Sequence, residues 1–198
     1  MQPMIYDIEI EKAIPSKKPD DILQDIDYCA GWHDHTNMGI SVICAYDYLT
    51  ERFRVFCKDN IDEFFKLAPE RLMVGFNSIP FDDAVIRATY GEIYQPMASY
   101  DILREIWKAS GLGSTFKYPS HIGYSLEAVA RANLFQGKTG NGALAPVQWQ
   151  RGEVGSVIDY CLQDVNITKL IFDRVCSGQK IISPKTGELL TLLEPQLF

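Results

Sequence analysis

The sequence predicts an α/β fold in which a mixed central sheet, an antiparallel meander plus parallel strands, is flanked by helices. Three observations support this fold class. Polar and apolar residues alternate in residues 4–10, 39–49 and 53–57, as expected of antiparallel strands. Residues 71–76 form a compact apolar run, which is typical of a buried parallel strand. Residues 153–176 form the longest segment with helical periodicity.

Composition indicates one globular domain that covers residues 1–198. A chain of 198 residues can bury a substantial core, and its 46% hydrophobic and 23% charged residues are usual for a soluble protein. No apolar run is long enough to span a bilayer, and the first residues lack the basic and apolar regions of a signal peptide. We therefore expect a cytoplasmic protein with no membrane partner.

Cysteine usage and net charge restrict the function further. The cysteines are odd in number, scattered and without a C-x-x-C pair, so we expect reduced thiols rather than disulfides or a zinc site. The net charge of -7 disfavours a protein that binds duplex DNA without regard to sequence. It leaves room for an enzyme that holds a few nucleotides through bound metal ions, because cations can neutralise phosphates.

The first predicted strand has one acidic face. Side chains alternate along a strand, which places Met4, Tyr6, Ile8 and Ile10 on one face and Ile5, Asp7, Glu9 and Glu11 on the other. Asp7 and Glu9 should then lie about 6–7 Å apart along the strand. Two carboxylates held this close repel, and a divalent cation would relieve the repulsion. Taken alone, this tripeptide favours a half-buried strand with a solvated acidic face, because D-x-E often arises by chance.

The segment between the first two strands is long and polar. We expect residues 12–38 to form a connection with one helical turn near residues 19–23, and its length suggests a function or an elaborated sheet edge. Within it, His33 and His35 flank Asp34 in what we interpret as a polar loop, because a single further histidine makes a histidine-rich metal site improbable.

The remaining segments alternate between helices and loops. The pattern predicts a helix at 60–68 capped by Asn60, a loop at 111–124, a helix at 126–134 capped by Ser125, a flexible loop at 137–142 with Lys138, and a C-terminal hairpin at about 179–192. The pattern leaves residues 100–107 open between strand and helix.

A second acidic candidate follows the buried strand. Asp82 comes just after residues 71–76 and begins a helix at 82–90, a place where α/β proteins hold ligands and where the helix dipole tolerates negative charge. It could equally be an ordinary N-terminal helix residue. Asp83 would point about 100° away around the helix, and we expect it to be solvated.

A third candidate lies in the long helix, where Tyr160 and Asp164 share one face. That face continues into the apolar residues Ile167 and Ile171, which indicates that the polar pair is also directed inward. A buried carboxylate is costly unless it is paired or coordinated. The alternative is a tyrosine–aspartate pair on a half-exposed surface.

Together the three segments resemble the DEDD superfamily of 3′–5′ exonucleases. D-x-E in the first strand is similar to its first motif, Asp82 to its second, and Tyr160 with Asp164 to the third motif of the tyrosine branch. Residues 74–82 are especially similar to the exonuclease domains of family-B DNA polymerases. The histidine branch would need a histidine where this chain has Asp159. The resemblance covers about residues 4–175 and implies a ribonuclease-H-like fold.

The resemblance also implies a mechanism. Two Mg²⁺ or Mn²⁺ ions would be held by Asp7, Glu9, Asp82 and Asp164 and would clamp the attacking and leaving oxygens of a phosphodiester at a 3′ end. Tyr160 would orient the water, because a tyrosine with an ordinary pKa of about 10 is a poor base. Asn77 and Phe81 are candidates for holding the terminal nucleotide, although Phe81 could equally be a core residue.

The implied activity is a 3′–5′ exonuclease that acts on single-stranded DNA, with RNA as an alternative substrate, and releases nucleoside 5′-monophosphates. Replication or repair proteins are further candidate partners. The alternative function is a non-catalytic nucleic-acid-binding or accessory module on the same fold. The acid set favours the enzyme, since a binding module has no need of carboxylates beside phosphates. The low basic content is the one point on the side of the alternative, and it indicates weak unaided binding of nucleic acid.

Overall fold

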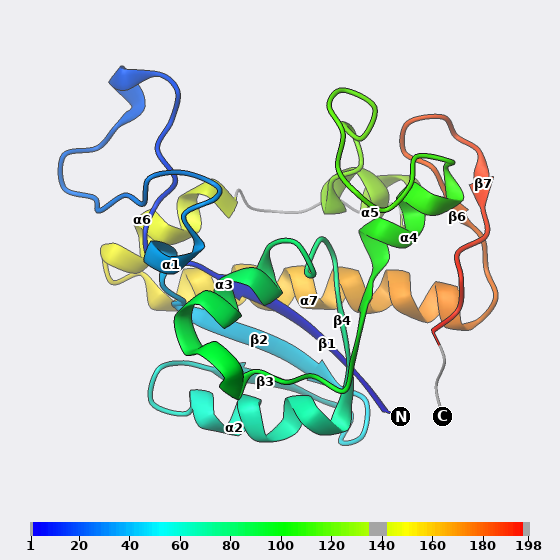
Figure 1. Ribbon diagram of the computed structural model, residues 1–198, viewed down its shortest axis with the longest axis horizontal. Coiled ribbons are helices and arrows are strands. Elements are labelled where there is room, and N and C mark those ends of the chain that lie inside the picture. Colours follow the sequence, from blue (N-terminus) through cyan, green and yellow to red (C-terminus); the bar gives the residue numbers. More distant parts are fainter. Residues whose placement is uncertain (1, 135–141, 196–198) are drawn as a thin grey trace.

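A computed structural model describes residues 2–134 and 142–195. It is an α/β structure with a five-stranded mixed sheet in the order β3-β2-β1-β4-β5, which confirms the predicted mixed sheet flanked by helices (Figure 1). The strands are β1 (Gln2–Glu9), β2 (Val42–Asp47), β3 (Arg52–Phe56), β4 (Arg71–Gly75) and β5 (Ala98–Asp101).

The central strand β1 joins the two halves of the sheet. It pairs antiparallel with β2, where Asp7 lies opposite Cys44, and β2 pairs antiparallel with β3. On its other side β1 pairs parallel with β4, but only from Gln2 to Ile5, and β4 pairs parallel with β5. The second half of β1 therefore extends beyond the end of β4, which exposes its edge to other partners.

Helices flank the sheet. They are α1 (His35–Met38), α2 (Ile61–Leu67), α3 (Asp82–Tyr90), α4 (Ile102–Ala109), α5 (Leu126–Leu134), α6 (Ala145–Gln150) and α7 (Val154–Cys176). Short 3-10 segments are η1 (Pro19–Asp21), η2 (Ala68–Glu70), η3 (Gly91–Ile93) and η4 (Gly142–Leu144), and β6 (Ile181–Ile182) pairs antiparallel with β7 (Leu189–Leu190) as the predicted hairpin. None of the helices in the described ranges is long and apolar enough to cross a membrane.

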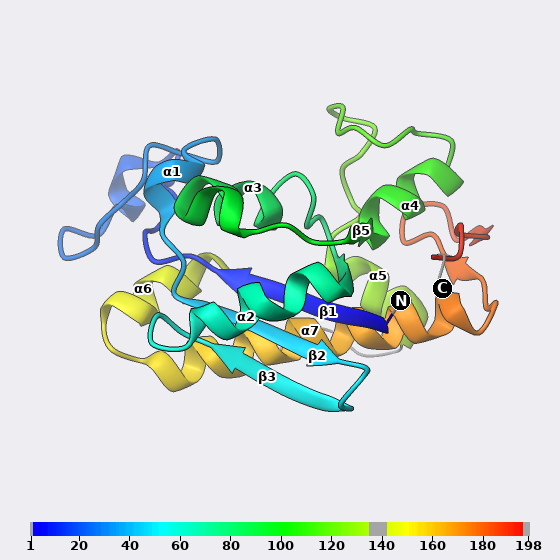
Figure 2. The same ribbon diagram turned by 60° about the horizontal axis from the view of Figure 1, so that its bottom comes forward.

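Each face of the sheet has its own apolar core, because both faces of β1 are covered. Met4, Tyr6 and Ile8 pack with α2 and α3, whereas Ile5 faces α7 together with Val42. Figure 2 shows α7 along one face of the sheet and α2 on the other. Asp7 and Glu9 share the face of Ile5, so the acidic face predicted for this strand is directed at α7 rather than at solvent.

Several predicted elements differ in detail. Residues 100–107, left open by the pattern, contain the end of β5 followed by α4, and the short helices α1 and α6 were not predicted. Asn60 precedes α2 but does not cap it; its side chain instead accepts a hydrogen bond from the backbone N–H of Cys57 at 2.6 Å. Ser125 does act as predicted, accepting from Ala128 N at 3.2 Å. Residues 137–141 of the predicted loop, with Lys138, lie outside the described residues, and Gly142 begins η4.

Candidate functional site

The carboxylates of β1 form the first part of the candidate site. Asp7 is half-buried and Glu9 is buried, and their carboxylate oxygens lie within 4.8 Å of each other and of the Cys161 sulfur. The Cys161 thiol, on α7, donates to the backbone oxygen of Asp7 at 3.4 Å and to its Oδ2 at 3.6 Å. A carboxylate pair that strand alternation predicts is thus held between the central strand and the long helix.

Asp82 joins this group from α3. Its Oδ1 accepts a hydrogen bond from the backbone N–H of Ile8 at 3.2 Å, at the part of β1 that extends beyond β4. The carboxyl is therefore a substitute for the missing strand partner. Burial raises the pKa of Asp82 above its usual range, and the charges of Asp7 and Asp83 raise it further. The negative charges of β1 and α3 consequently act on one another across a small space.

The turn between β4 and α3 depends on a close approach of its backbone. A Cβ on Gly75 would lie 2.4 Å from the Cβ of Ser78, so only glycine fits without displacing the turn. Asn77 adopts a left-handed backbone with φ of 64°, and the backbone oxygen of Ser78 accepts from Asp83 N at 2.9 Å. This tight turn sets where α3 begins and therefore where Asp82 lies.

A second aspartate fastens the same turn. Asp101, at the end of β5, accepts from the backbone N–H groups of Asn77 at 3.0 Å and Ile79 at 3.2 Å. It also caps α4 by accepting from Leu103 and Arg104 at 3.0 and 3.3 Å. Burial raises the pKa of Asp101, and its backbone hydrogen bonds oppose that shift. One buried carboxylate thus joins the site turn to the neighbouring strand and helix.

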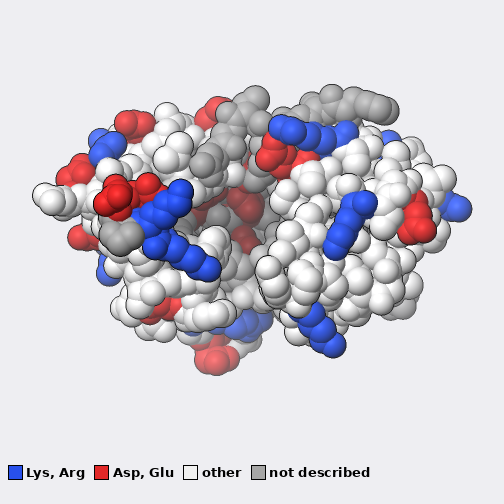
Figure 3. Space-filling view, turned by 90° about the horizontal axis from the view of Figure 1, so that it is seen from above, with Lys and Arg blue, Asp and Glu red and all other residues white. Residues whose placement is uncertain are grey.

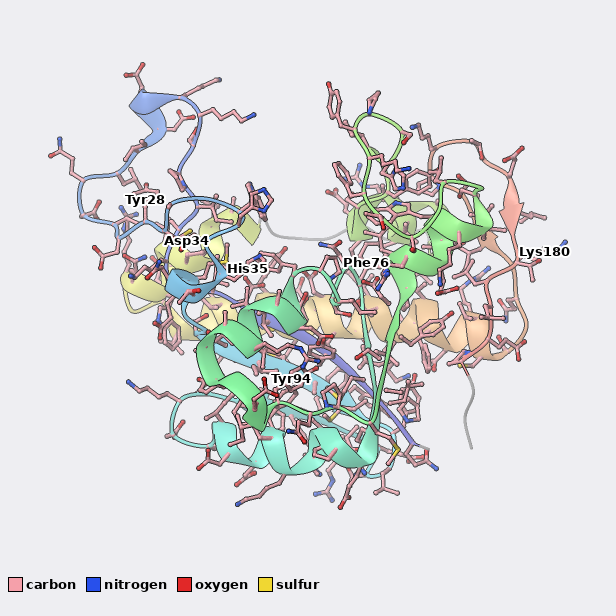
Figure 4. All side chains as sticks on the ribbon, viewed as in Figure 1. Tyr28, Asp34, His35, Phe76, Tyr94 and Lys180 are labelled. Atoms are coloured by element: carbon pink, nitrogen blue, oxygen red, sulfur yellow. The ribbon has the colours of Figure 1, made fainter. Side chains whose placement is uncertain are left out.

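The prediction that Asp83 is solvated is wrong. Its side chain is 5% exposed, and its Oδ1 accepts hydrogen bonds from the hydroxyls of Tyr6 and, at 2.7 Å, Tyr94. Tyr94, labelled in Figure 4, comes from the segment after η3, and Tyr6 precedes Asp7 on β1. Tyr6 and Tyr94 cover the side of α3 that the periodicity predicts to be exposed. Asp83 therefore anchors the helix on that side, while Asp82 contacts Ile8 of β1.

The long helix brings the third pair of predicted residues. Asp164 is 5% exposed and lies one helical turn from Cys161, whereas Tyr160 is half-buried. α7 packs against both β1 and β2. The Tyr160 hydroxyl lies 3.0 Å from the point where a Cβ on Gly142 would stand, which places it beside the segment that precedes α6.

An open cleft of about 630 Å³ adjoins part of this group. Glu9, Phe81 and Tyr160 line it, together with Trp32 and Lys17 of the 12–38 connection. Figure 3 shows a hollow in the molecule, seen from above, with acidic side chains at its floor. Of the predicted acids, Glu9 lines this space, Asp7 lies within 4.8 Å of Glu9, and the charge of Asp7 acts on Asp82. Asp164 lies farther along α7 and is not among the described residues that line the cleft.

A second, larger groove of about 1090 Å³ adjoins the cleft. Trp32 and Phe81 line both spaces, and their ring centroids are 5.9 Å apart. Asn77 lines the groove and is not among the described residues that line the cleft. The two predicted nucleotide-holding residues therefore differ. Phe81 borders both the cleft and the groove, whereas Asn77 borders the groove.

The donor set fits a hard divalent cation. Asp7, Glu9, Asp82 and Asp164 offer carboxylate oxygens, which are the ligands that Mg²⁺ and Mn²⁺ prefer. Cys161 is the soft exception, but burial raises the pKa of its thiol and so keeps it protonated, and only a thiolate is a strong ligand. The group could therefore hold a cation through oxygen, with the thiol as a hydrogen-bond donor to Asp7.

Sequence reasoning did not find Cys161, Asp101 or Trp32 as parts of the site. Cys161 could have been found, since it follows Tyr160 and precedes Asp164 by one helical turn. Asp101 carries the weaker signal of an aspartate before an amphipathic helix, and Trp32 has none beyond its place in a long connection. Comparison of the chain with protein-family models gave no match, and comparison with curated proteins gave none either.

Proposed function

We propose that the protein is a metal-dependent 3′–5′ exonuclease with a ribonuclease-H-like fold, which hydrolyses phosphodiester bonds at the 3′ ends of single-stranded DNA, with RNA as an alternative substrate. One observation carries this proposal. Glu9 lines an open cleft together with Phe81 and Tyr160, and Asp7 lies within 4.8 Å of Glu9 and of Cys161 on α7. The charge of Asp7 acts on the buried Asp82 of α3, and Asp164, which is also buried, lies one helical turn after Cys161. Closely spaced carboxylate oxygens are the ligands that hard divalent cations prefer.

The chain's own residues would act as follows. Asp7, Glu9, Asp82 and Asp164 would hold two Mg²⁺ or Mn²⁺ ions, which would supply stabilisation of the attacking and leaving oxygens at the phosphate. Tyr160 lines the cleft, and its hydroxyl would orient the attacking water by a hydrogen bond. Phe81, between the cleft and the groove, would contact the terminal base, and Asn77 would contact the strand on the groove side.

Two hydrogen bonds fix the orientation of acids in this group. Ile8 N–H and the Cys161 thiol are neutral donors, and each contacts one oxygen of Asp82 or Asp7. The pKa of Asp82 is raised, which is the behaviour of a carboxyl that has too little positive charge nearby. A bound cation would reverse that imbalance.

The test is hydrolysis of a single-stranded DNA oligonucleotide labelled at its 5′ end, in the presence of Mn²⁺. We expect a ladder of products that shorten from the 3′ end, and the loss of that ladder in Asp7→Asn. Asp59→Asn is the matched control, because Asp59 is exposed in the turn before α2 and should leave the ladder unchanged. DNA and RNA oligonucleotides that both stay intact with the wild-type protein would overturn the proposal and favour the non-catalytic binding module.

A further inference from the structure

The groove beside the acidic cleft differs from the rest of this acidic protein. Among the described residues that line it there is no aspartate or glutamate, although the chain carries a net charge of -7. The three histidines of the sequence, His33, His35 and His121, all line it, and so does Arg104. In Figure 3 the surface to the right of the hollow, over α4 and the loop that follows it, is largely without charged side chains.

Aromatic rings form both sides of the groove. On one side are Trp32, which is 65% exposed, and Phe81, whose ring meets His35 edge-on at 6.1 Å. On the other side is Phe116, which is 56% exposed and has its ring centroid 6.2 Å from that of Trp107. Large exposed rings at a groove are costly in water, which indicates that they have a ligand.

Two polar atoms of the lining have no hydrogen-bond partner within the described part of the chain. They are Nε1 of Trp107 and Nε2 of His121, in side chains that are 4% and 3% exposed. Nδ1 of His121 lies 3.1 Å from the backbone oxygen of Lys117 and 2.9 Å from the hydroxyl of Ser120. Both atoms are buried, so the surface that a ligand would meet is formed by the exposed rings rather than by these two groups.

We propose that this groove binds the unpaired bases of a single-stranded nucleic acid, with Trp32 and Phe116 as stacking residues on its two sides. The direction of the strand rests on the proposed function: its end would pass Trp32 and Phe81, which line both spaces, to reach the carboxylates. Bases present flat faces to aromatic rings, and stacking does not depend on base identity. The absence of carboxylates from the described lining spares the phosphates from repulsion. The 12–38 connection, through Trp32, is then part of the substrate-binding surface.

The test is binding in the absence of divalent ions, so that no hydrolysis occurs. A fluorescent oligodeoxythymidylate is titrated with the wild-type protein in EDTA and its anisotropy is measured. We expect Trp32→Ala and Phe116→Ala each to weaken binding by roughly 5- to 100-fold, the range given by loss of one base–aromatic stack, and Trp32→Phe to recover most of it. Phe53→Ala is the control, since Phe53 is a 46% exposed aromatic on β3 that does not line the groove.

An oligonucleotide with abasic sites separates stacking from general attraction to phosphates. We expect the wild-type protein to bind it as weakly as Trp32→Ala binds the ordinary oligonucleotide, and Trp32→Ala to show no further loss. Equal affinity of the wild-type protein for both oligonucleotides, unchanged affinity in both alanine variants, or no oligonucleotide binding would each overturn the inference. If the protein shortens DNA but the variants bind normally, this inference fails alone; base-dependent binding without hydrolysis would instead contradict the proposed function.

Discussion

Asp82 has two tasks that one substitution can separate. Its carboxyl accepts the Ile8 N–H, a task that an amide oxygen can also perform, and its charge is proposed to hold a cation. The same charge is unfavourable in the metal-free protein, because burial and the nearby Asp7 oppose ionisation. The isosteric asparagine keeps the first task and removes the second.

We therefore expect Asp82→Asn to melt at the same or a higher temperature than the wild-type protein in EDTA, and to lose the rise in melting temperature on addition of Mn²⁺. Removal of a ligand should weaken Mn²⁺ binding at least as much as removal of an outer partner, which costs about 10- to 100-fold. Differential scanning fluorimetry with and without Mn²⁺ measures both effects. A variant that is less stable in EDTA and still fully stabilised by Mn²⁺ would contradict this account.

Asp83 tests the structural side of the same helix turn. Tyr94→Phe removes one of the two tyrosine hydroxyls that donate to the buried carboxylate, and it leaves a charge with one partner fewer. We expect a loss of about 1.5–3 kcal/mol in the free energy of unfolding, the usual range for a hydrogen bond to a charged group. Urea unfolding measures it, and Tyr90→Phe, a variant of a half-buried tyrosine on the same helix, is the control. A loss no larger than that of the control would show that the pair is unimportant.

Among individual residues, the sequence predicted the positions that follow from periodicity. Asp7 and Glu9 share a face because strand side chains alternate, and Asp82 lies at the site because it begins a helix after a buried strand. Asp83 could not be placed in this way, because the partners that bury it, Tyr6 and Tyr94, come from other segments of the chain.

Among the elements, the turn from β4 to α3 is the part on which the site geometry depends most. Gly75 and Ser78 approach so closely that a methyl group on Gly75 would meet the Ser78 side chain at 2.4 Å. Its nearest other neighbour, the backbone oxygen of Tyr6, would be at an ordinary 3.4 Å. The conflict therefore involves a single partner.

We expect Gly75→Ala to destabilise the protein by about 1–3 kcal/mol through overpacking, and Ser78→Gly in the same chain to recover part of that loss. The prediction is a coupling between the two positions, measured by urea unfolding of both single variants and the double variant. Strictly additive losses would show that the turn accommodates the methyl group in another way.

Sequence periodicity also explains which elements were predicted. The strands β1 to β4 and the helix α7 have regular patterns, and their bounds were expected within a few residues. The short helices α1 and α6 contain only 4 and 6 residues, too few for a periodic pattern. Residues 100–107 stayed undecided between strand and helix for a different reason. A strand ends at Asp101 and a helix begins at the next residue, so the segment mixes the two periods.

For the whole molecule, the acid cluster predicts a pH-dependent response to metal ions. The pKa of Asp82 in the folded protein is above the ordinary value of 3.8, so the folded state retains a proton that the unfolded chain releases. In the metal-free protein this group therefore lowers stability as pH rises above that value. A cation competes with the proton, and its stabilising effect should grow over the same range.

We thus expect Mn²⁺ to raise the melting temperature more at about pH 8 than at about pH 5, with melting in EDTA at each pH as the reference. At a concentration about 100 times the dissociation constant, the stabilisation should be about 2.7 kcal/mol, or roughly 5–10 °C for a domain of this size. An equal rise at both pH values, or the same rise in Asp82→Asn, would assign the metal effect to another site.

We propose that carboxylates of β1, α3 and α7 together hold divalent cations. The most direct measurement is anomalous diffraction from crystals of the protein grown with Mn²⁺. We expect anomalous peaks within coordination distance of the carboxylate oxygens of Asp7, Glu9, Asp82 and Asp164. Well-diffracting crystals with no peak at this cluster, or with peaks elsewhere alone, would contradict it.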